Sequence, residues 1–255
     1  MSCLKVEDIG ISFGGLKAVQ DVTFAVEPGE IMGLIGPNGA GKTTTLNLIS
    51  GLYTVDTGKV YLGDTEVTKL TAYQRARMGL GRTFQTPRFL TRSTVSDNMK
   101  LGTDLADQMG YLKSFLGVKG RNFLDEVDEL MEIADLKVDW KADISSLTYG
   151  QLKRLEIVRG LLAHPKVMLI DEPAAGLNAK ELEKSVALMR HAAKQGVGIV
   201  LIEHKMDMIM SVCDHIVVLN FGKMIAHGTP DEVSSNEDVI EAYLGKKGAK
   251  DDAEG

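Results

Sequence analysis

The sequence has few cysteines, no long apolar run and no excess of positive charge. Its two cysteines, Cys3 and Cys213, lie far apart and fit no metal-ligand spacing, so we expect free thiols in a reducing cytosol. No stretch approaches the roughly 20 consecutive apolar residues that span a bilayer. Acidic residues stand near the start, where a signal peptide has its apolar run, so we expect no secretory signal.

The charge balance argues against one class of partner, without excluding a local basic patch. The formal net charge is -6 at pH 7, whereas a surface that holds nucleic acid needs a basic patch, so we expect no nucleic-acid partner. The 255 residues, 44% of them hydrophobic, suffice for one large domain or two small ones with a real core. If the chain serves a membrane, we expect it to do so from the cytosolic side, through a partner.

The first part of the chain is predicted to form strands. Apolar residues alternate with smaller or polar ones over 22–26, which predicts a half-buried antiparallel strand. Residues 31–35 form a continuous apolar run, which is typical of a central strand buried on both faces. A glycine-rich segment follows this run, and residues 43–51 then continue as a predicted helix.

The middle and the end of the chain have different patterns. Residues 87 to 163 have a helical pattern, and apolar residues over 123–134 mark one face of an amphipathic helix. The stretch 102–120 is less regular, and a loop or broken helices both fit it. After Pro165 strands alternate with helices, which favours a parallel sheet with crossover helices. The charged and small residues 246–255 predict a disordered tail.

The glycine-rich segment has the pattern of a phosphate-binding loop, Gly-x4-Gly-Lys-Thr between a strand and a helix. Its glycines let backbone N–H groups point at phosphate oxygens, and the helix adds its positive N-terminal end. Lys42 is expected to reach the β- and γ-phosphates, and the Thr43 hydroxyl to bind Mg²⁺. By itself the loop does not separate kinases, GTPases and transport ATPases. The candidate ATP-binding residues of this segment are Gly36, Pro37, Asn38, Gly39, Ala40, Gly41, Lys42, Thr43 and Thr44.

Two carboxylates, Asp171 and Glu172, end a second apolar run over 167–170. They are expected at the carboxyl end of a buried strand, where α/β sheets place their ligands. Neighbouring side chains on a strand point different ways, so Asp171 can serve Mg²⁺ while Glu172 orients or deprotonates the attacking water. A strand exit without any function is the alternative, but the phosphate-binding loop requires such a carboxylate partner.

Residues 147–151, Leu-Thr-Tyr-Gly-Gln, resemble the LSGGQ signature of the ATP-binding cassette (ABC) ATPases. They precede a predicted helix and stand shortly upstream of the carboxylate strand, as in that family. In the family this helix N-terminus contacts the γ-phosphate of ATP held by the other subunit, which suits its free N–H groups and its dipole. Tyr149 stands where the family has its first glycine, so we expect reduced space there rather than lost function. The resemblance assigns the partner's ATP to Leu147, Thr148, Tyr149, Gly150 and Gln151.

Single residues match further elements of the family. Gln85 is similar to the Q-loop glutamine, which senses Mg²⁺ and water, and His204 is similar to the switch histidine that contacts the γ-phosphate. The resemblance therefore implies a catalytic set of Glu172, His204 and Gln85, and a metal set of Thr43, Gln85 and Asp171. Phe13 resembles the aromatic residue that stacks on adenine, although a core phenylalanine fits that position almost as well.

The resemblance covers residues 4–245 and implies an α/β P-loop NTPase fold. That fold has a RecA-like parallel-sheet core and an antiparallel β subdomain over 4–86 and 164–245, with a helical subdomain over 87–163. Within the family the chain is most similar to the LivG-type ATP-binding subunits of high-affinity branched-chain amino acid importers. The segments behind that similarity include Gly-Arg-Thr-Phe-Gln ending at Gln85, and Glu-Pro-Ala-Ala-Gly-Leu-Asn ending at Asn178, where the D-loop of the family commonly has aspartate.

The resemblance also implies an assembly. Two ATPase subunits, this chain with a LivF-like sister or with a second copy of itself, sandwich two ATP molecules head to tail. Two transmembrane permease subunits and an extracytoplasmic solute-binding protein complete the transporter, and the chain lies on the cytoplasmic face of the membrane. ATP and Mg²⁺ are the implied cofactors, and leucine, isoleucine and valine the implied cargo.

Other functions stay open at this stage. The same motor could serve another cargo, such as urea, short amides or an exported lipid. A soluble ABC ATPase of DNA repair or translation usually carries tandem cassettes, long insertions or basic arms, and none is found in this sequence. A small-molecule P-loop kinase would leave the signature, Gln85 and His204 unexplained.

Overall fold

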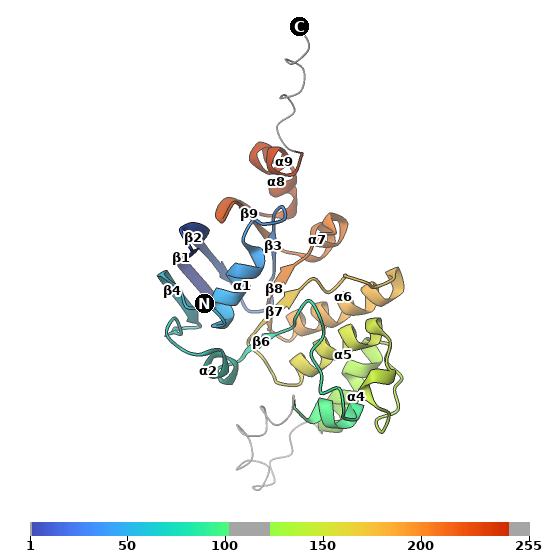
Figure 1. Ribbon diagram of the computed structural model, residues 1–255. Coiled ribbons are helices and arrows are strands. Elements are labelled where there is room, and N and C mark those ends of the chain that lie inside the picture. The colour runs from blue at the N-terminus through green and yellow to red at the C-terminus, as the bar shows by residue number, and fades with distance from the viewer. Residues whose placement is uncertain (1, 102–122, 245–255) are drawn as a thin grey trace.

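A computed structural model describes residues 2–101 and 123–244 of the chain. It has an α/β fold in which helices and two sheets form layers (Figure 1). The predicted irregular stretch 102–120 and the predicted tail 246–255 lie outside the described residues. Within the described residues no helix is both long enough and apolar enough to cross a membrane.

The smaller sheet is antiparallel, with strand order β2-β1-β4-β5. The alternation over 22–26 is confirmed, because β2 pairs antiparallel with β1, and its Val22, Phe24 and Val26 are buried. In Figure 1 this sheet lies on the side of the molecule opposite helices α4, α5 and α6. Its strands are β1 (Leu4–Phe13), β2 (Leu16–Val26), β4 (Thr57–Leu62) and β5 (Thr65–Glu66).

The larger sheet has the strand order β10-β9-β3-β8-β7-β6. All of its pairs are parallel except β9 with β10, which form an antiparallel hairpin at the edge. Every residue of β3, β7 and β8 is buried, which explains why these strands read as continuous apolar runs. The strands are β3 (Ile31–Ile35), β6 (Leu80–Arg82), β7 (Val167–Asp171), β8 (Gly198–Ile202), β9 (His215–Asn220) and β10 (Lys223–Gly228).

Helices cover the larger sheet and connect its strands. The predicted amphipathic helix at 123–134 is confirmed as α4, and the predicted helix after the glycine-rich segment as α1. A further helical stretch covers residues 95–101. The helices with named bounds are α1 (Lys42–Ser50), α2 (Ala72–Arg77), α4 (Phe123–Ile133), α5 (Tyr149–Leu161), α6 (Ala179–Lys194), α7 (Met206–Val212), α8 (Pro230–Ser234) and α9 (Glu237–Leu244), with a 3-10 turn η1 (Ile144–Ser146) before α5.

Two hydrophobic clusters lie on the two faces of the larger sheet. Alternate residues of β3 divide between them: Met32 and Leu34 join the cluster that faces the antiparallel sheet and α1, and Ile31 and Ile35 join the other. The second cluster includes the apolar face of α5 and α6. The larger sheet is thereby fixed on both sides, which holds the carboxyl ends of its strands in place as a rigid platform.

Candidate nucleotide-binding site

The glycine-rich loop joins β3 to α1, and its backbone requires glycine. Gly36 has φ 149° and Gly41 has φ 101°. A Cβ on Gly36 would lie 2.1 Å from the Leu219 carbonyl oxygen, and one on Gly41 2.7 Å from the Ala18 carbonyl oxygen. A Cβ on Gly39 would meet no atom within 4 Å. The loop therefore packs against neighbouring backbone at its ends and faces open space at its tip.

Helix α1 begins with unsatisfied donors directed at this space. Its N-cap, Gly41, makes no side-chain capping bond, and the first turn carries no acidic residue. Free N–H groups and the positive end of the helix dipole attract an anion. A cavity of about 400 Å³ lies here. Its lining residues are Leu16, Lys17, Ala18, Asn38, Gly39, Ala40, Gly41, Lys42, Thr43, Thr44, Glu172, His204, Phe221 and Gly222.

Lys42 is a buried cation at the floor of the cavity. Its Nζ donates to the carbonyl oxygens of Gly36, at 2.7 Å, and Pro37, at 3.0 Å. Burial lowers the pKa of Lys42, while the carboxylates of Glu172 and Asp171 act in the opposite direction. The ammonium is therefore held by backbone carbonyls of the same glycine-rich loop.

Asp171 is the last residue of β7 and is buried. Its Oδ2 lies 3.9 Å from Nη2 of Arg82, and its backbone N–H donates to the Thr83 hydroxyl at 3.3 Å. Burial raises the pKa of Asp171, and Arg82 opposes that shift. Its carboxylate, the exposed Thr43 hydroxyl and the Gln85 amide oxygen are hard oxygen donors of the kind that Mg²⁺ prefers, so the residues fit that ion.

Glu172 is held by contacts to both its side chain and its backbone. Its Oε2 accepts a hydrogen bond from Gln85 Nε2 at 2.9 Å, and its Oε1 lies 2.8 Å from His204 Nε2. Its backbone has φ 48°, which is uncommon for a residue with a side chain. The structure thus brings together the predicted catalytic residues Glu172, Gln85 and His204, which are far apart in sequence.

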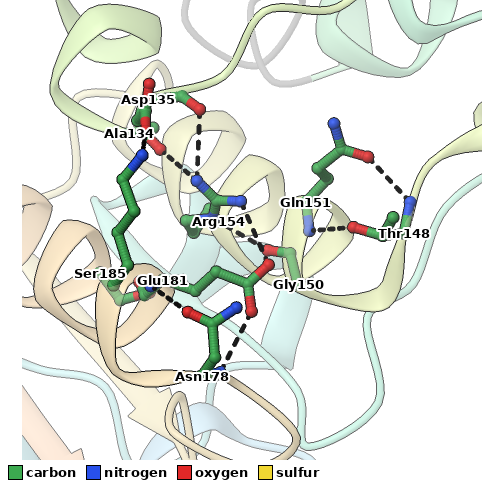
Figure 2. Close-up of polar contacts among 10 residues, drawn as sticks. Ala134, Asp135, Thr148, Gly150, Gln151, Arg154, Asn178, Glu181 and Ser185 are labelled. Carbon is green, nitrogen blue, oxygen red and sulfur yellow. Dashed lines mark hydrogen bonds and ion pairs between the residues drawn. The ribbon is translucent and has the colours of Figure 1, made fainter.

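The signature residues lie at the start of α5, outside the lining of the cavity, although the Tyr149 hydroxyl donates to the Gln85 carbonyl. None of the five belongs to the described lining of the cavity at the glycine-rich loop. Thr148 and Gln151 form a capping box at the start of α5: the Gln151 N–H donates to the Thr148 hydroxyl at 3.2 Å, and the Thr148 N–H to Gln151 Oε1 at 2.9 Å (Figure 2). Leu147 precedes the cap, following η1. The predicted signature is therefore the N-terminus of a helix, but it does not face the phosphate-binding loop of its own chain.

Gly150 and Asn178 are joined through one polar network (Figure 2). Asn178 is the N-cap of α6, and its side chain accepts a hydrogen bond from the Glu181 N–H at 3.0 Å. Glu181 Oε1 lies 3.5 Å from Arg154 Nη2, and Arg154 Nε donates to the Gly150 carbonyl at 3.1 Å. A Cβ on Gly150 would lie 2.1 Å from Glu181 Oε1, so a side chain at this position would displace the Glu181 carboxylate from the network.

Phe13 lies outside the described lining of the cavity. It sits at the end of β1 and contacts Tyr53 edge-on, with ring centroids 5.4 Å apart. Stacking of Phe13 on adenine therefore stays a prediction. The structure instead lines the cavity with Leu16 and Phe221, two strongly exposed apolar side chains at 72% and 83%.

Sequence reasoning missed three residues near the site: Leu16, Phe221 and Lys153. Leu16 is the first residue of β2 and Phe221 lies in the turn between β9 and β10, and at such positions an exposed apolar residue gives no periodic signal. Lys153 lies within a helix, and its Nζ donates to the Glu172 carbonyl at 3.0 Å. Its place two residues after the signature was the only hint of a role in the sequence. Its contact with Glu172 could not be predicted, because that contact depends on how α5 packs.

Comparison with known proteins gives consistent similarities along the chain. The profile of the ABC transporter family matches residues 19–175, and that of the branched-chain amino acid ATP-binding cassette transporters matches residues 223–249. The high-affinity branched-chain amino acid transport ATP-binding protein LivG of Escherichia coli (strain K12) is 39% identical over 252 residues, which are 95% of this chain and 98% of LivG. The corresponding protein BraF of Pseudomonas aeruginosa is 36% identical over 249 residues, which are 95% of this chain and 98% of BraF.

A solved structure is similar over nearly the whole chain. It is the ADP conformation of an ATP-binding cassette from an ABC transporter, with a TM-score of 0.81 and 30% sequence identity. The match covers 96% of this chain and all of the solved chain. The two-sheet architecture described above is therefore shared with a protein crystallised in a nucleotide-bound state.

Proposed function

Because this chain belongs to the ATP-binding subunits of branched-chain amino acid ABC transporters, it is a transport ATPase, and we propose that residues 36–44, Asp171 and Glu172 form its half of an ATP site. Backbone N–H groups of the loop and of the first turn of α1 bind the phosphates, and Lys42 adds a positive charge. Phe13 stacks on adenine at the far end of the nucleotide.

The same proposal assigns the metal and catalytic residues. Thr43, Gln85 and Asp171 would hold Mg²⁺, which when bound would neutralise charge on the phosphate oxygens. Glu172 accepts a proton from, or orients, the water that attacks the γ-phosphate, and His204 and Gln85 hold its carboxylate in place. The observation that carries this assignment is the pair of contacts at 2.9 and 2.8 Å that fix both oxygens of Glu172 at the edge of the cavity.

Glu172→Gln tests the assignment. The amide keeps the shape and one acceptor oxygen but cannot accept the proton, so ATP binding persists while turnover falls by about 100-fold or more. ATP affinity from calorimetry and phosphate release from the assembled transporter measure the two effects. Glu183→Gln, an exposed change on α6, is the matched control and leaves both unchanged. Turnover of Glu172→Gln at the wild-type rate would exclude Glu172 as the base.

Residues 147–151 complete the ATP site of a second ATPase subunit. Their placement outside the cavity of their own chain supports this, because the N-terminus of α5 is then free to meet a nucleotide held by another subunit. The second subunit is a LivF-like sister or a second copy. The motor further assembles with two permease subunits and an extracytoplasmic solute-binding protein, at the cytoplasmic face of the membrane.

The assembly and its cargo are tested together. Affinity purification of the tagged chain from membranes is expected to recover a sister ATPase and two permease chains. After reconstitution with the binding protein, leucine, isoleucine or valine stimulates ATP hydrolysis, whereas urea and short amides do not. Stimulation by urea alone, or by a lipid without any binding protein, would contradict the cargo. The profile match over 223–249 favours branched-chain amino acids over these alternatives.

A further inference from the structure

Lys153 is a buried cation for which the mechanism above has no use. It lies in the second turn of α5 and is only 3% exposed. Burial lowers the pKa of Lys153, and the carboxylates of Glu156, Asp171, Glu172 and Glu203 act in the opposite direction. A buried ammonium is costly to desolvate unless it is well bonded, so its partner is informative.

That partner is the backbone of Glu172. Lys153 Nζ donates to the Glu172 carbonyl oxygen at 3.0 Å, and the Ala175 N–H reaches the same oxygen at 3.3 Å. On the other side the Glu172 N–H donates to the Ile202 carbonyl at 2.9 Å. Since the backbone φ of Glu172 is 48°, these bonds hold a conformation that the chain does not favour by itself.

Tyr149, one turn earlier on α5, contacts the surroundings of Glu172 by a second route. Its hydroxyl donates to the Gln85 carbonyl oxygen at 3.1 Å, and the Gln85 side chain donates to Glu172 Oε2. A Cβ on Gly176 would lie 3.0 Å from the Tyr149 ring, so the ring lies directly over that glycine. Lys153 Nζ lies 5.8 Å from the centre of the same ring. The first two turns of α5 therefore contact the Glu172 carbonyl, the Gln85 carbonyl and the loop at Gly176.

We propose that Lys153, assisted by Tyr149, is a positioning residue that sets the orientation of the Glu172 carboxylate from the signature helix of the same chain. A contact made by residues 147–151 with the partner's ATP then displaces Lys153 and the Glu172 carbonyl together, because α5 is a single rigid helix. The nucleotide in one site thus adjusts the catalytic carboxylate of the other. The inference rests on the proposed role of Glu172 as the base.

Lys153→Met, in the full chain within the assembled transporter, tests this proposal. Methionine has similar length and no charge, so kcat falls about 10- to 100-fold while KM for ATP stays within about twofold. Lys153→Arg, which keeps a donor, restores most of the loss. Tyr149→Phe removes only the hydroxyl and lowers kcat about three- to tenfold. Lys69→Met and Tyr73→Phe, both exposed changes, are the matched controls and leave kcat unchanged.

A second measurement separates positioning from structural damage. If Lys153 acts through Glu172, Lys153→Met adds no further loss to the residual single-turnover hydrolysis of Glu172→Gln. Equal losses in both backgrounds, or wild-type kcat in Lys153→Met, would overturn the proposal. If a thermal melt shows that Lys153→Met is unfolded, Tyr149→Phe is measured instead, in wild type and in Glu172→Gln. An equal loss of hydrolysis in the two would overturn the proposal. Wild-type turnover of Glu172→Gln would instead defeat the proposed base.

Discussion

At the scale of single residues, two buried lysines show how surroundings assign a role. Burial lowers the pKa of both Lys42 and Lys153, and the carboxylates of Asp171 and Glu172 oppose the shift in each case. Lys42 borders a cavity, so its charge is available to a ligand. Lys153 does not line that cavity, and its ammonium donates to the backbone carbonyl of Glu172. The surroundings of the two ammonium groups therefore support different proposed roles, phosphate binding for Lys42 and positioning of Glu172 for Lys153.

Lys42→Ala is expected to weaken ATP binding about 10- to 100-fold, because a charged hydrogen-bond donor to phosphate is lost. Isothermal titration calorimetry with ATP measures the change. Lys137→Ala, an exposed lysine beyond α4, is the control and keeps wild-type affinity. Undiminished affinity in Lys42→Ala would contradict the assignment of the phosphate-binding loop.

Both cysteines are free thiols with raised pKa values. Burial raises the pKa of Cys3 to about 11 and that of Cys213 to about 12. Their thiolate fraction at pH 8 is therefore about a hundredfold or more below that of an ordinary cysteine. Iodoacetamide is expected to label them slowly in the folded protein and rapidly in urea, as mass spectrometry will show. Rapid labelling of folded Cys213 at pH 8 would contradict its burial.

At the scale of elements, the N-termini of the helices differ in whether a side chain caps their first N–H groups. Helices α2, α5, α6 and α8 begin with capping boxes, in which a side chain satisfies the first free N–H groups. Helix α1 begins at glycine with no side-chain cap, which leaves its donors for phosphate. At the cap of α6, Asn178 stands where the D-loop of the family commonly has aspartate, and the two residues cap equally well.

Substitutions at these caps have a predictable effect on stability. Thr148→Ala and Asn178→Ala each lower the free energy of unfolding by about 1 kcal/mol, because a capping bond is lost. Asn178→Asp stays within about 0.5 kcal/mol of wild type, since the carboxylate caps as well as the amide. Urea denaturation monitored by circular dichroism measures these differences. A loss above about 1 kcal/mol in Asn178→Asp would indicate that repulsion from Glu181 outweighs capping.

At the scale of the whole molecule, two predicted nucleotide contacts lie in different parts of the chain. It holds a phosphate-binding loop with its carboxylates at one place and a signature helix at another, and the latter does not line its own cavity. Under the proposal that residues 147–151 complete the ATP site of another subunit, nucleotide binding and subunit association are linked.

ATP is therefore expected to stabilise the chain and to drive its association. At 100 times the dissociation constant, binding adds about 2.7 kcal/mol to the free energy of unfolding. In Glu172→Gln, which binds without turnover, ATP with Mg²⁺ shifts the protein to a larger species with its partner subunit, as light scattering will detect. Removing Mg²⁺ with EDTA abolishes hydrolysis. A thermal shift of equal size in Lys42→Ala would show that ATP binds elsewhere.

Much of the fold follows from local pattern. The apolar runs at β3, β7 and β8 predict buried strands because both faces of the larger sheet are covered, and the alternation in β2 predicts a strand with one covered face. The order of the strands does not follow from these patterns. It depends on which strands pair across long loops, and the position of β3 between β8 and β9 arises only in the folded chain.

The sequence alone is enough to predict three motifs: a phosphate-binding loop, two carboxylates and a signature helix. Each consists of contiguous residues, whose spacing fixes its local geometry. Only the tertiary structure brings the side chains of the site into contact with one another. Gln85 and Glu172 are separated by 87 residues, and Tyr149 and Gln85 by 64, yet each pair is hydrogen-bonded. These contacts depend on how the helices and strands pack against one core, and packing is a property of the whole chain rather than of any segment.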